Sequence, residues 1–473
     1  YQAGEDITTG VQNTLIGGLA GDALTTGSFN TAIGYNALTA EDTGGTAIAI
    51  GYYALNAQNY DGNSYNIAIG HSAGSQVTTG IQNAIIGGFA GDALTTGSNN
   101  VAIGFGSLSA EDSHGRNVAV GQGTLQNQNA GSDAYNIAIG YEAGNDITTG
   151  LYNTIIGGLA GDALTTGREN VAVGFRALST EDGNGKNTAI GFDALRDLNA
   201  GTDSYNTAVG HSAGMVMGSG VQNTLIGGLA GDALTTGSYN VAVGAYALSS
   251  EDTGSKNVAI GREALENQNY DGDAYNVAIG YQASKYVTTG TENTIIGGLA
   301  GDALTTGSFN VAIGRSALGA ETTGSRNIAI GRRALSSQDQ GSNAYNIAIG
   351  YEAGKNTTTG VQNIIVGGLA GDAITTGKRI VAIGYNALSA ETEGDQIVAI
   401  GDSCLTNYNV GDNDSNVVAV GYQAAQNMTT GTNGVIIGSL AGNALTTGSN
   451  NVVLGYNALG AEKIGRASCR ERV

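Results

Sequence analysis

The sequence predicts an all-β fold, a parallel β-solenoid or β-roll, from three observations. A phrase of the form Asn-x-Ala-Ile-Gly recurs along almost the whole chain. Its copies are spaced by 17, 17, 19 and 17 residues, which together make a unit of 70. The composition combines 79 glycines and no proline with 41% hydrophobic residues, so glycine is expected to punctuate an ordered β structure rather than a disordered chain.

The glycine of the phrase marks each coil of the predicted solenoid. It first stands at Gly17 and last at Gly455, with 26 copies in all. The residue before it is Ile or Val in 25 copies, the residue three after it is Ala in 23, and the residue four before it is Asn in 21. Fixed columns at a constant period are typical of coils that stack on one another. We therefore expect one array of about 26 coils over residues 1–462.

The phrase predicts a short strand in each coil, because it is too short for a helix and β-branched at its centre. Alternation puts Thr31 and Ile33 on one face and Asn30, Ala32 and Gly34 on the other. Stacking is expected to bury the Ile/Val column as an apolar ladder, and the Asn column to form a ladder of side-chain amides, each donating to the next. The predicted ladder residues include Ile16, Gly17, Ile33, Gly34, Ile50, Gly51, Ile69, Gly70, Asn13, Asn30 and Asn66.

The third coil of each unit carries a longer loop rich in Asn, Asp and Tyr, such as NAQNYDGNSY at 56–65 and ENQNYDGDAY at 266–275. Loops on a rigid scaffold are where solenoids usually carry recognition. Tyr60, Tyr65, Tyr270 and Tyr275 are therefore candidate ligand contacts. The alternative is that these rings only pack their loops back onto the solenoid.

Both ends of the array are expected to be truncated, because YQAGEDITTG at 1–10 begins inside a motif that recurs at 141–150. The segment KIGRASCRERV at 463–473 departs from the repeat and matches, codon by codon, a sequencing-library adapter read in frame. We interpret it as an artefact, with a short basic tail as the alternative. Cys404 then remains, in the small Ala column, and is expected to replace a buried Ala.

The formal net charge of −21 argues against nucleic acids and anionic membranes as partners, since both attract basic surfaces. No stretch approaches the roughly 18 consecutive apolar residues of a membrane span. The sequence shows no nucleophile motif, phosphate-binding loop or metal-ligand cluster. None of the three histidines (His71, His114 and His211) has a ligand-spaced partner. We therefore expect no enzyme activity, no cofactor and no metal.

Several weaker alternatives depend on repeated motifs. The stretch GGLAGD at 17–22 is similar to a calcium-binding nonapeptide repeat but recurs only every 70 residues. The acidic loops YDGNS at 60–64 and YDGDA at 270–274 are better candidates for incidental calcium, although a solvated acidic turn is preferred. The TTG turns suggest an ice-binding threonine array, yet they occupy mainly two coils of four. Acidic pairs such as Glu41-Asp42 recur without a distinct pocket.

Three Asn-x-Ser/Thr sequons are candidate N-glycosylation sites, at Asn356, Asn413 and Asn427. They do not recur in every unit, so chance also explains them.

The phrase N-x-A-I-G-x-x-A resembles the head repeats of trimeric autotransporter adhesins and the NTAIGYxAL arrays of tail-fibre-like proteins from phages and environmental bacteria. The resemblance covers residues 1–462, although the coils here are longer than in the adhesin heads. It implies a left-handed parallel β-roll in which three chains lie side by side, outside the cell, at the cell surface or on a virion.

The leading expectation is a structural protein, the shaft of an extracellular fibre or filament that self-associates as a homotrimer or end to end. The alternative is an adhesin or a phage receptor-binding fibre that recognises surface glycans through its Tyr/Asn-rich loops.

Overall fold

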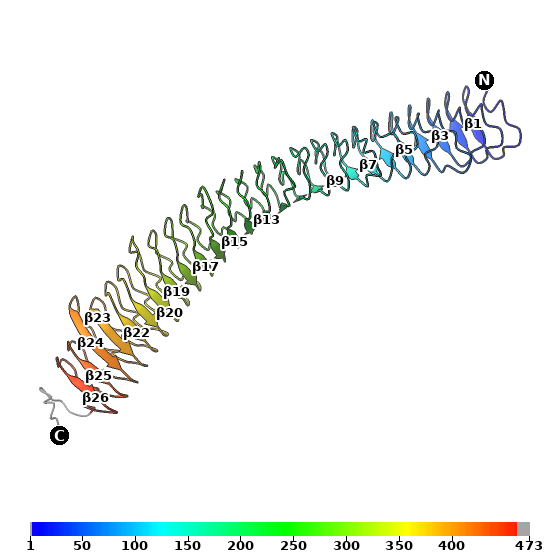
Figure 1. The fold of residues 1–473 in the computed structure, drawn as a ribbon. Coiled ribbons are helices and arrows are strands. Elements are labelled where there is room, and N and C mark those ends of the chain that lie inside the picture. Colours follow the sequence, from blue (N-terminus) through cyan, green and yellow to red (C-terminus); the bar gives the residue numbers. More distant parts are fainter. Residues whose placement is uncertain (1, 461–473) are drawn as a thin grey trace. The chain divides into compact units, whose positions relative to one another are not determined.

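The computed structural model describes residues 2–460, which form a parallel β-solenoid with one short strand in each coil (Figure 1). No helix occurs among these residues. The chain divides into two compact units, one up to Tyr239 and one from Asn240 onward. The predicted fold class is therefore confirmed. The predicted tail at 463–473 lies outside the described residues, as do Tyr1 and positions 461 and 462.

Thirteen strands belong to each unit. Those of the first unit are β1 (Thr14–Ile16), β2 (Thr31–Ile33), β3 (Ile48–Ile50), β4 (Ile67–Ile69), β5 (Ala84–Ile86), β6 (Val101–Ile103), β7 (Val118–Val120), β8 (Ile137–Ile139), β9 (Thr154–Ile156), β10 (Val171–Val173), β11 (Thr188–Ile190), β12 (Thr207–Val209) and β13 (Thr224–Ile226). Those of the second are β14 (Val241–Val243), β15 (Val258–Ile260), β16 (Val277–Ile279), β17 (Thr294–Ile296), β18 (Val311–Ile313), β19 (Ile328–Ile330), β20 (Ile347–Ile349), β21 (Ile364–Val366), β22 (Val381–Ile383), β23 (Asp395–Ile400), β24 (Asp414–Val420), β25 (Val435–Ile437) and β26 (Val452–Leu454).

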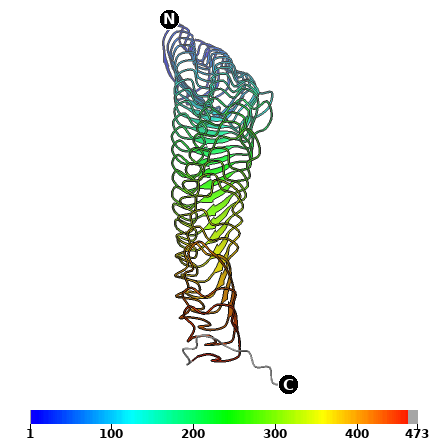
Figure 2. The same ribbon diagram turned by 90° about the vertical axis from the view of Figure 1, so that its left-hand side faces the viewer.

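Consecutive strands within a unit pair in parallel and in register, apart from one register shift near Asp395 in the β23–β24 pair; Figure 2 shows the strands stacked one after another. Thr31 of β2 lies beside Ile48 of β3, and Ile33 lies beside Ile50. The turns are stacked as well, because their amides donate to carbonyls of neighbouring coils; the Leu38 amide, for example, donates to Ala54 over 3.0 Å. Each coil thus supplies the hydrogen-bond partners that its neighbours lack, which explains why a single copy of the phrase has no stable structure of its own.

The interior of each coil is narrow and filled by small side chains opposite large ones. In the β2 coil, Ala32 faces inward together with Leu38, and both are fully buried. In the β5 coil the sizes are exchanged: the inward strand residue is Ile85, and a Cβ added at Gly91 would contact it at 3.5 Å. This exchange keeps the filled volume similar from coil to coil, as close packing requires.

The structure corrects the predicted burial of the Ile/Val column. Alternation along the strand holds, but the inward face carries Asn30 and Ala32, which are 1% and 0% exposed. Ile33 and Ile50 are only half-buried, and Ile16 is 58% exposed. The ladder itself exists, since these isoleucines are register partners. The reason for the inversion in the β2 coil is the filled interior: Leu38 occupies the space opposite the strand, which leaves room for Ala32 inside and places Ile33 outside.

The Asn column forms a buried ladder, but with a different bonding pattern from the predicted one. The Asn66 Oδ1 accepts a hydrogen bond from the backbone amide of Asn83 at 2.9 Å, and the Asn66 Nδ2 donates to the carbonyl of Gly80 at 2.7 Å. Side-chain amides therefore bond mainly to backbone groups of the next coil. Only some steps add a direct amide-to-amide bond, such as Asn153 to Asn136 at 3.3 Å. The column satisfies backbone groups that would otherwise be buried without partners.

The glycine that ends each strand is required by its surroundings. Gly34 has a φ of +136°, and a Cβ there would overlap the carbonyl group of Gly51 in the next coil. Any side chain would therefore push the coils apart, in addition to straining the backbone. The same close approach recurs one coil later, where a Cβ at Gly51 would overlap the carbonyl of Gly70.

The second unit contains one concerted departure from the repeat, where the Asn column lapses. Ile380, Ile397 and Val417 occupy Asn positions and are fully buried. Tyr408 of the same region is also fully buried and donates its hydroxyl to the carbonyl of Gly431 at 2.9 Å. A hydrophobic plug thus replaces the amide ladder here, and β23 and β24 lengthen to six and seven residues.

Candidate functional site

The outward strand residues form an exposed apolar face along each unit. Two side chains per three-residue strand point outward: Thr, Val or Ile at the first position, with Ala84 as the exception in β5, and Ile or Val at the third, with Leu454 as the exception in β26. The flanking coils cover their edges, which leaves Ile86, Ile139 and Ile226 of the first unit 36%, 39% and 39% exposed. In the second unit Ile364 and Ile437 are 40% and 38% exposed. Contiguous apolar surfaces of this kind mark contact sites on soluble proteins. Hereafter this surface is called the outer strand face.

One edge of the outer strand face is bordered by the residues that directly follow each marker glycine, the "+1 column". In the first unit this column contains stacked rings: Tyr35 and Tyr52 have centroids 5.6 Å apart, and Tyr52 and His71 5.1 Å apart. Phe192 and His211 repeat the arrangement at 5.2 Å. In-register stacking of coils brings these rings together although 17 or 19 residues separate them.

The other edge is bordered by the residues five before each marker glycine, among them the candidate ligand residues Tyr65 and Tyr275. These are 57% and 51% exposed. The Tyr275 ring lies 5.0 Å from the ammonium group of Lys256, which also forms a 2.6 Å ion pair with Asp273. Tyr135 and Tyr152 stack in this column at 5.8 Å. The rings therefore pack against neighbouring coils while one side stays accessible.

The other two candidate ligand residues do not join them. Tyr60 and Tyr270 are half-buried within the long loops. A Cβ added at Gly62 would lie 3.1 Å from the Tyr60 ring, so this ring covers its own loop. The four tyrosines thus belong to two different places, the loop and the edge of the outer strand face.

Six copies of the 70-residue repeat also bury a glutamate, which in four of them stands beside an aspartate and looks in the sequence like part of a solvated acidic pair. Glu251 is fully buried and its carboxylate accepts hydrogen bonds from the Gly254 amide at 2.7 Å, the Gln268 side chain at 3.2 Å and the Tyr270 amide at 3.3 Å. Glu41 is held in the same way by Gly44 and Gln58, and its pKa, like that of Glu251, is raised by burial. These carboxylates hold the long loop to the preceding turn, which is a structural role.

A second carboxylate column comes from the GGLAGD turns. The Asp22, Asp92, Asp162, Asp232 and Asp372 side chains each have a buried Oδ1 atom without a hydrogen-bond partner. Burial raises the pKa of Asp162 to about 6, and the nearby carboxylates of Asp146 and Glu142 contribute to the same shift. Burial also raises the pKa of Asp92, Asp232 and Asp372, so the charged form of these carboxylates carries an energetic penalty at neutral pH.

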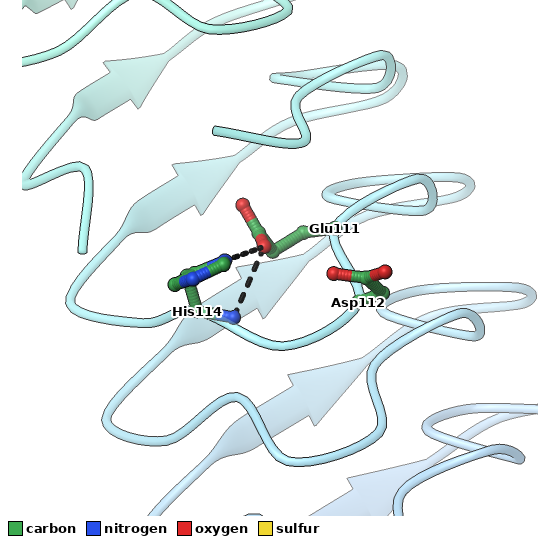
Figure 3. Close-up of side chains that lie close together, drawn as sticks. All are labelled: Glu111, Asp112 and His114. Atoms are coloured by element: carbon green, nitrogen blue, oxygen red, sulfur yellow. Dashed lines mark hydrogen bonds and ion pairs between the residues drawn. The ribbon is translucent and has the colours of Figure 1, made fainter. Parts of the chain in front are cut away.

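The structure brings Glu111, Asp112 and His114 together in one turn (Figure 3). Their potential ligand atoms all lie within 4.8 Å of one another, so the expectation that no histidine has a ligand-spaced partner is wrong for His114. However, the buried Glu111 carboxylate already accepts hydrogen bonds from the His114 amide at 3.1 Å and from Gln128 at 3.3 Å. Asp112 accepts one from Ser113 at 2.8 Å. Glu111 therefore holds its turn through hydrogen bonds in the same way as Glu41 and Glu251 do in other 70-residue repeats.

The three sequon asparagines are exposed: Asn356, Asn413 and Asn427. Asn427 donates to the carbonyl of Asn443 at 2.9 Å, and Asn413 donates to that of Val410 at 3.1 Å. Cys404 is fully buried, as expected for a residue in the Ala column, and burial raises the pKa of its thiol to about 12. The thiol is therefore protonated at neutral pH.

Within residues 2–460 no helix has both the length and the apolar character needed to cross a bilayer. No protein-family model matches the chain, and no curated protein matches its sequence. Fold and surface thus define the class of protein: a parallel β-solenoid with tandem repeats and an exposed apolar strand face.

Sequence reasoning missed the outer strand face and the stacked +1 column. A usable signal existed, because aligning the coils on their marker glycines places Tyr35 above Tyr52 and Arg315 above Arg332. The positions directly after the glycine are free to vary, and variable positions carry whatever differs between coils. The buried glutamates gave no such signal, since an acidic residue beside another is ordinarily solvated.

Proposed function

We propose that this protein is structural and forms the shaft of an extracellular fibre or filament by self-association through the outer strand face. The observation that carries the proposal is the apolar character of that face, which consists of Ile, Val and Thr with one Ala and contains no charged strand residue in β1–β22. An identical chain offers an identical face, and burying the two against each other removes apolar surface from water.

The buried groups of the molecule suit a structural role without chemistry. The buried polar columns serve stacking, and the acidic groups hold turns. The resemblance of the repeats to adhesin heads and tail-fibre arrays supports a location outside the cell and a trimer as the assembled form. End-to-end association is the competing mode, and it uses the coil ends rather than the strand face.

The test compares the assembly of the wild-type chain with two triple variants by light scattering coupled to size-exclusion chromatography. One variant places lysines on the outer strand face in alternate coils, and the matched control places lysines at exposed positions away from the strands. The substitutions are Ile50→Lys, Ile86→Lys and Val120→Lys against Gln76→Lys, Thr79→Lys and Gln126→Lys.

We expect an assembly of fixed stoichiometry for the wild type and the control, and monomers for the strand variant with unchanged circular dichroism. A wild-type chain that stays monomeric at all concentrations would refute self-association. An open-ended series of masses that is the same for the wild type and the strand variant would show that the chains associate end to end and not through the outer strand face.

A further inference from the structure

The second unit concentrates positive charge at one place on its surface. Arg315 and Arg332 occupy the +1 column on the consecutive coils of β18 and β19, and Arg333 follows directly. Together with Ser316 these three arginines line a half-open depression of ≈ 240 Å³. The first two are exposed and the third is half-buried. In a chain with only 19 Lys and Arg residues and a net charge of −21, such a grouping is unusual.

The two exposed guanidinium groups lack the carboxylate partners that neighbouring Arg333 and the equivalent Arg262 have. Within residues 2–460, Arg315 and Arg332 form no ion pair, whereas Arg333 contacts the Glu352 carboxylate at 3.3 Å. Arg262 holds the same +1 position in the β15 coil and pairs with Glu263 at 2.7 Å. Two unpaired like charges on adjacent coils repel each other, so an anion from outside the chain would stabilise both. The planar guanidinium fork suits sulfate, carboxylate and phosphate groups.

Aromatic rings extend this depression along the same column. Tyr351 follows Arg332 on the next coil, is 48% exposed and has its ring centroid 5.7 Å from the Arg332 guanidinium. On the other side of the depression, Tyr281 is 49% exposed. Gly298 lies between Tyr281 and Arg315 in the column and has no side chain to fill this part of the surface, where only the Tyr281 carbonyl oxygen lies within 4 Å of an added Cβ. Rings supply apolar faces for stacking, and the arginines between them supply charge.

We propose that this column binds an acidic polysaccharide, with sulfate or carboxylate groups held by Arg315 and Arg332 and a sugar ring placed against Tyr351. An extended polymer of this kind carries anionic groups at regular intervals and apolar ring faces between them, which matches coils that stack about every 4.8 Å. The overall negative charge of the chain limits polyanion binding to the place where positive charge collects. The proposal does not depend on the shaft function or on self-association.

The experiment measures binding of the full chain to immobilised dextran sulfate, to alginate as a carboxylate polymer, and to neutral dextran by surface plasmon resonance. We expect binding to one or both acidic polymers and none to neutral dextran, with affinity falling as salt rises. The double variant Arg315→Ala/Arg332→Ala should weaken binding at least tenfold. The matched control Arg262→Ala removes an arginine of the same column that already has a partner, and should leave binding unchanged.

Two further variants separate charge from shape. Arg315→Lys/Arg332→Lys keeps the charge but loses the fork, so its affinity should fall between that of wild type and that of the alanine variant. Tyr351→Ala should weaken polymer binding but not the weak competition by inorganic sulfate. Absence of wild-type binding to both acidic polymers, or equal binding by the alanine variant, would overturn the proposal. Equally tight, arginine-dependent binding of single-stranded DNA would overturn the polysaccharide assignment in favour of phosphate polymers in general.

Discussion

Replacing Asp162 by asparagine should stabilise the coil that contains β9 at neutral pH. The Asp162 carboxylate has a buried Oδ1 atom without a hydrogen-bond partner, and burial together with Asp146 and Glu142 raises its pKa from 3.8 to about 6. A raised pKa means that the folded coil holds the neutral acid more readily than the charged form. Asparagine has a similar shape and no charge, so it removes the penalty.

The magnitude and its pH dependence follow from that shift. About two pKa units at about 1.4 kcal/mol each give an upper value of about 3 kcal/mol, and partial exposure of the carboxylate reduces it to about 1–2 kcal/mol. Because the folded pKa lies above the unfolded one, the contribution of Asp162 is most favourable below the ordinary pKa and is lost as pH rises through about 6. The Asp162→Asn variant should therefore gain stability above about pH 6 and nothing below about pH 4.

Hydrogen exchange read by mass spectrometry on peptides covering 154–170 measures this local stability without requiring two-state unfolding, which repeat arrays often violate. At about pH 7.5 the protection should rise about 5- to 30-fold, because 1.4 kcal/mol is a factor of about ten. The control is Asp203→Asn, because Lys186 lowers the pKa of Asp203 and the sign reverses. The measurement is repeated at about pH 4, where the substitution should change nothing. An equal effect of Asp162→Asn at about pH 4 and about pH 7.5, or lower protection at about pH 7.5, would refute the reasoning.

Three further predictions concern packing. Gly34→Ala should shift the urea midpoint downward by more than Gly131→Ala, because a Cβ at the first overlaps a carbonyl of the next coil and at the second meets nothing within 4 Å; equal shifts would contradict the stacking argument. The Cys404 thiol should resist alkylation by iodoacetamide until urea unfolds the chain, as mass spectrometry of its tryptic peptide would show, and rapid labelling of the native protein would contradict its burial. Tyr408→Phe should cost about 0.5–1.5 kcal/mol in urea unfolding for one lost hydrogen bond, whereas a neutral result would mean that water replaces it.

The buried glutamates show how a local reading of sequence can mislead. Glu41 stands beside Asp42 in a Gly-rich turn, a setting typical of solvated charge. Its actual partner is Gln58, 17 residues later, at 3.0 Å. Of the six 70-residue repeats that contain this glutamate, four have glutamine at the position of Gln58, the third repeat has Leu198 and the sixth has Tyr408. The role of the glutamate depends on what the next coil supplies, which only column-by-column alignment of the coils can suggest.

The sequence alone determined the repeat, the strand in each coil and the in-register stacking. These follow from local requirements that recur at a fixed period: a glycine where the next coil approaches, an asparagine that satisfies neighbouring backbone groups, and a β-branched centre. A residue pattern records such requirements directly, so the parallel β-solenoid was predictable down to the columns that stack.

Only the tertiary structure decided which face of the strand is buried. Ala32 and Ile33 are both apolar, so alternation separates their faces without ranking them. In the β2 coil the buried Leu38 fills the interior opposite the strand, which leaves room for Ala32 and turns Ile33 outward. The room available to a strand residue is a property of the closed coil and not of the strand. The outer strand face, and the position of Arg315 next to Arg332 at its edge, exist for the same reason: stacked coils bring together residues that are not neighbours in sequence.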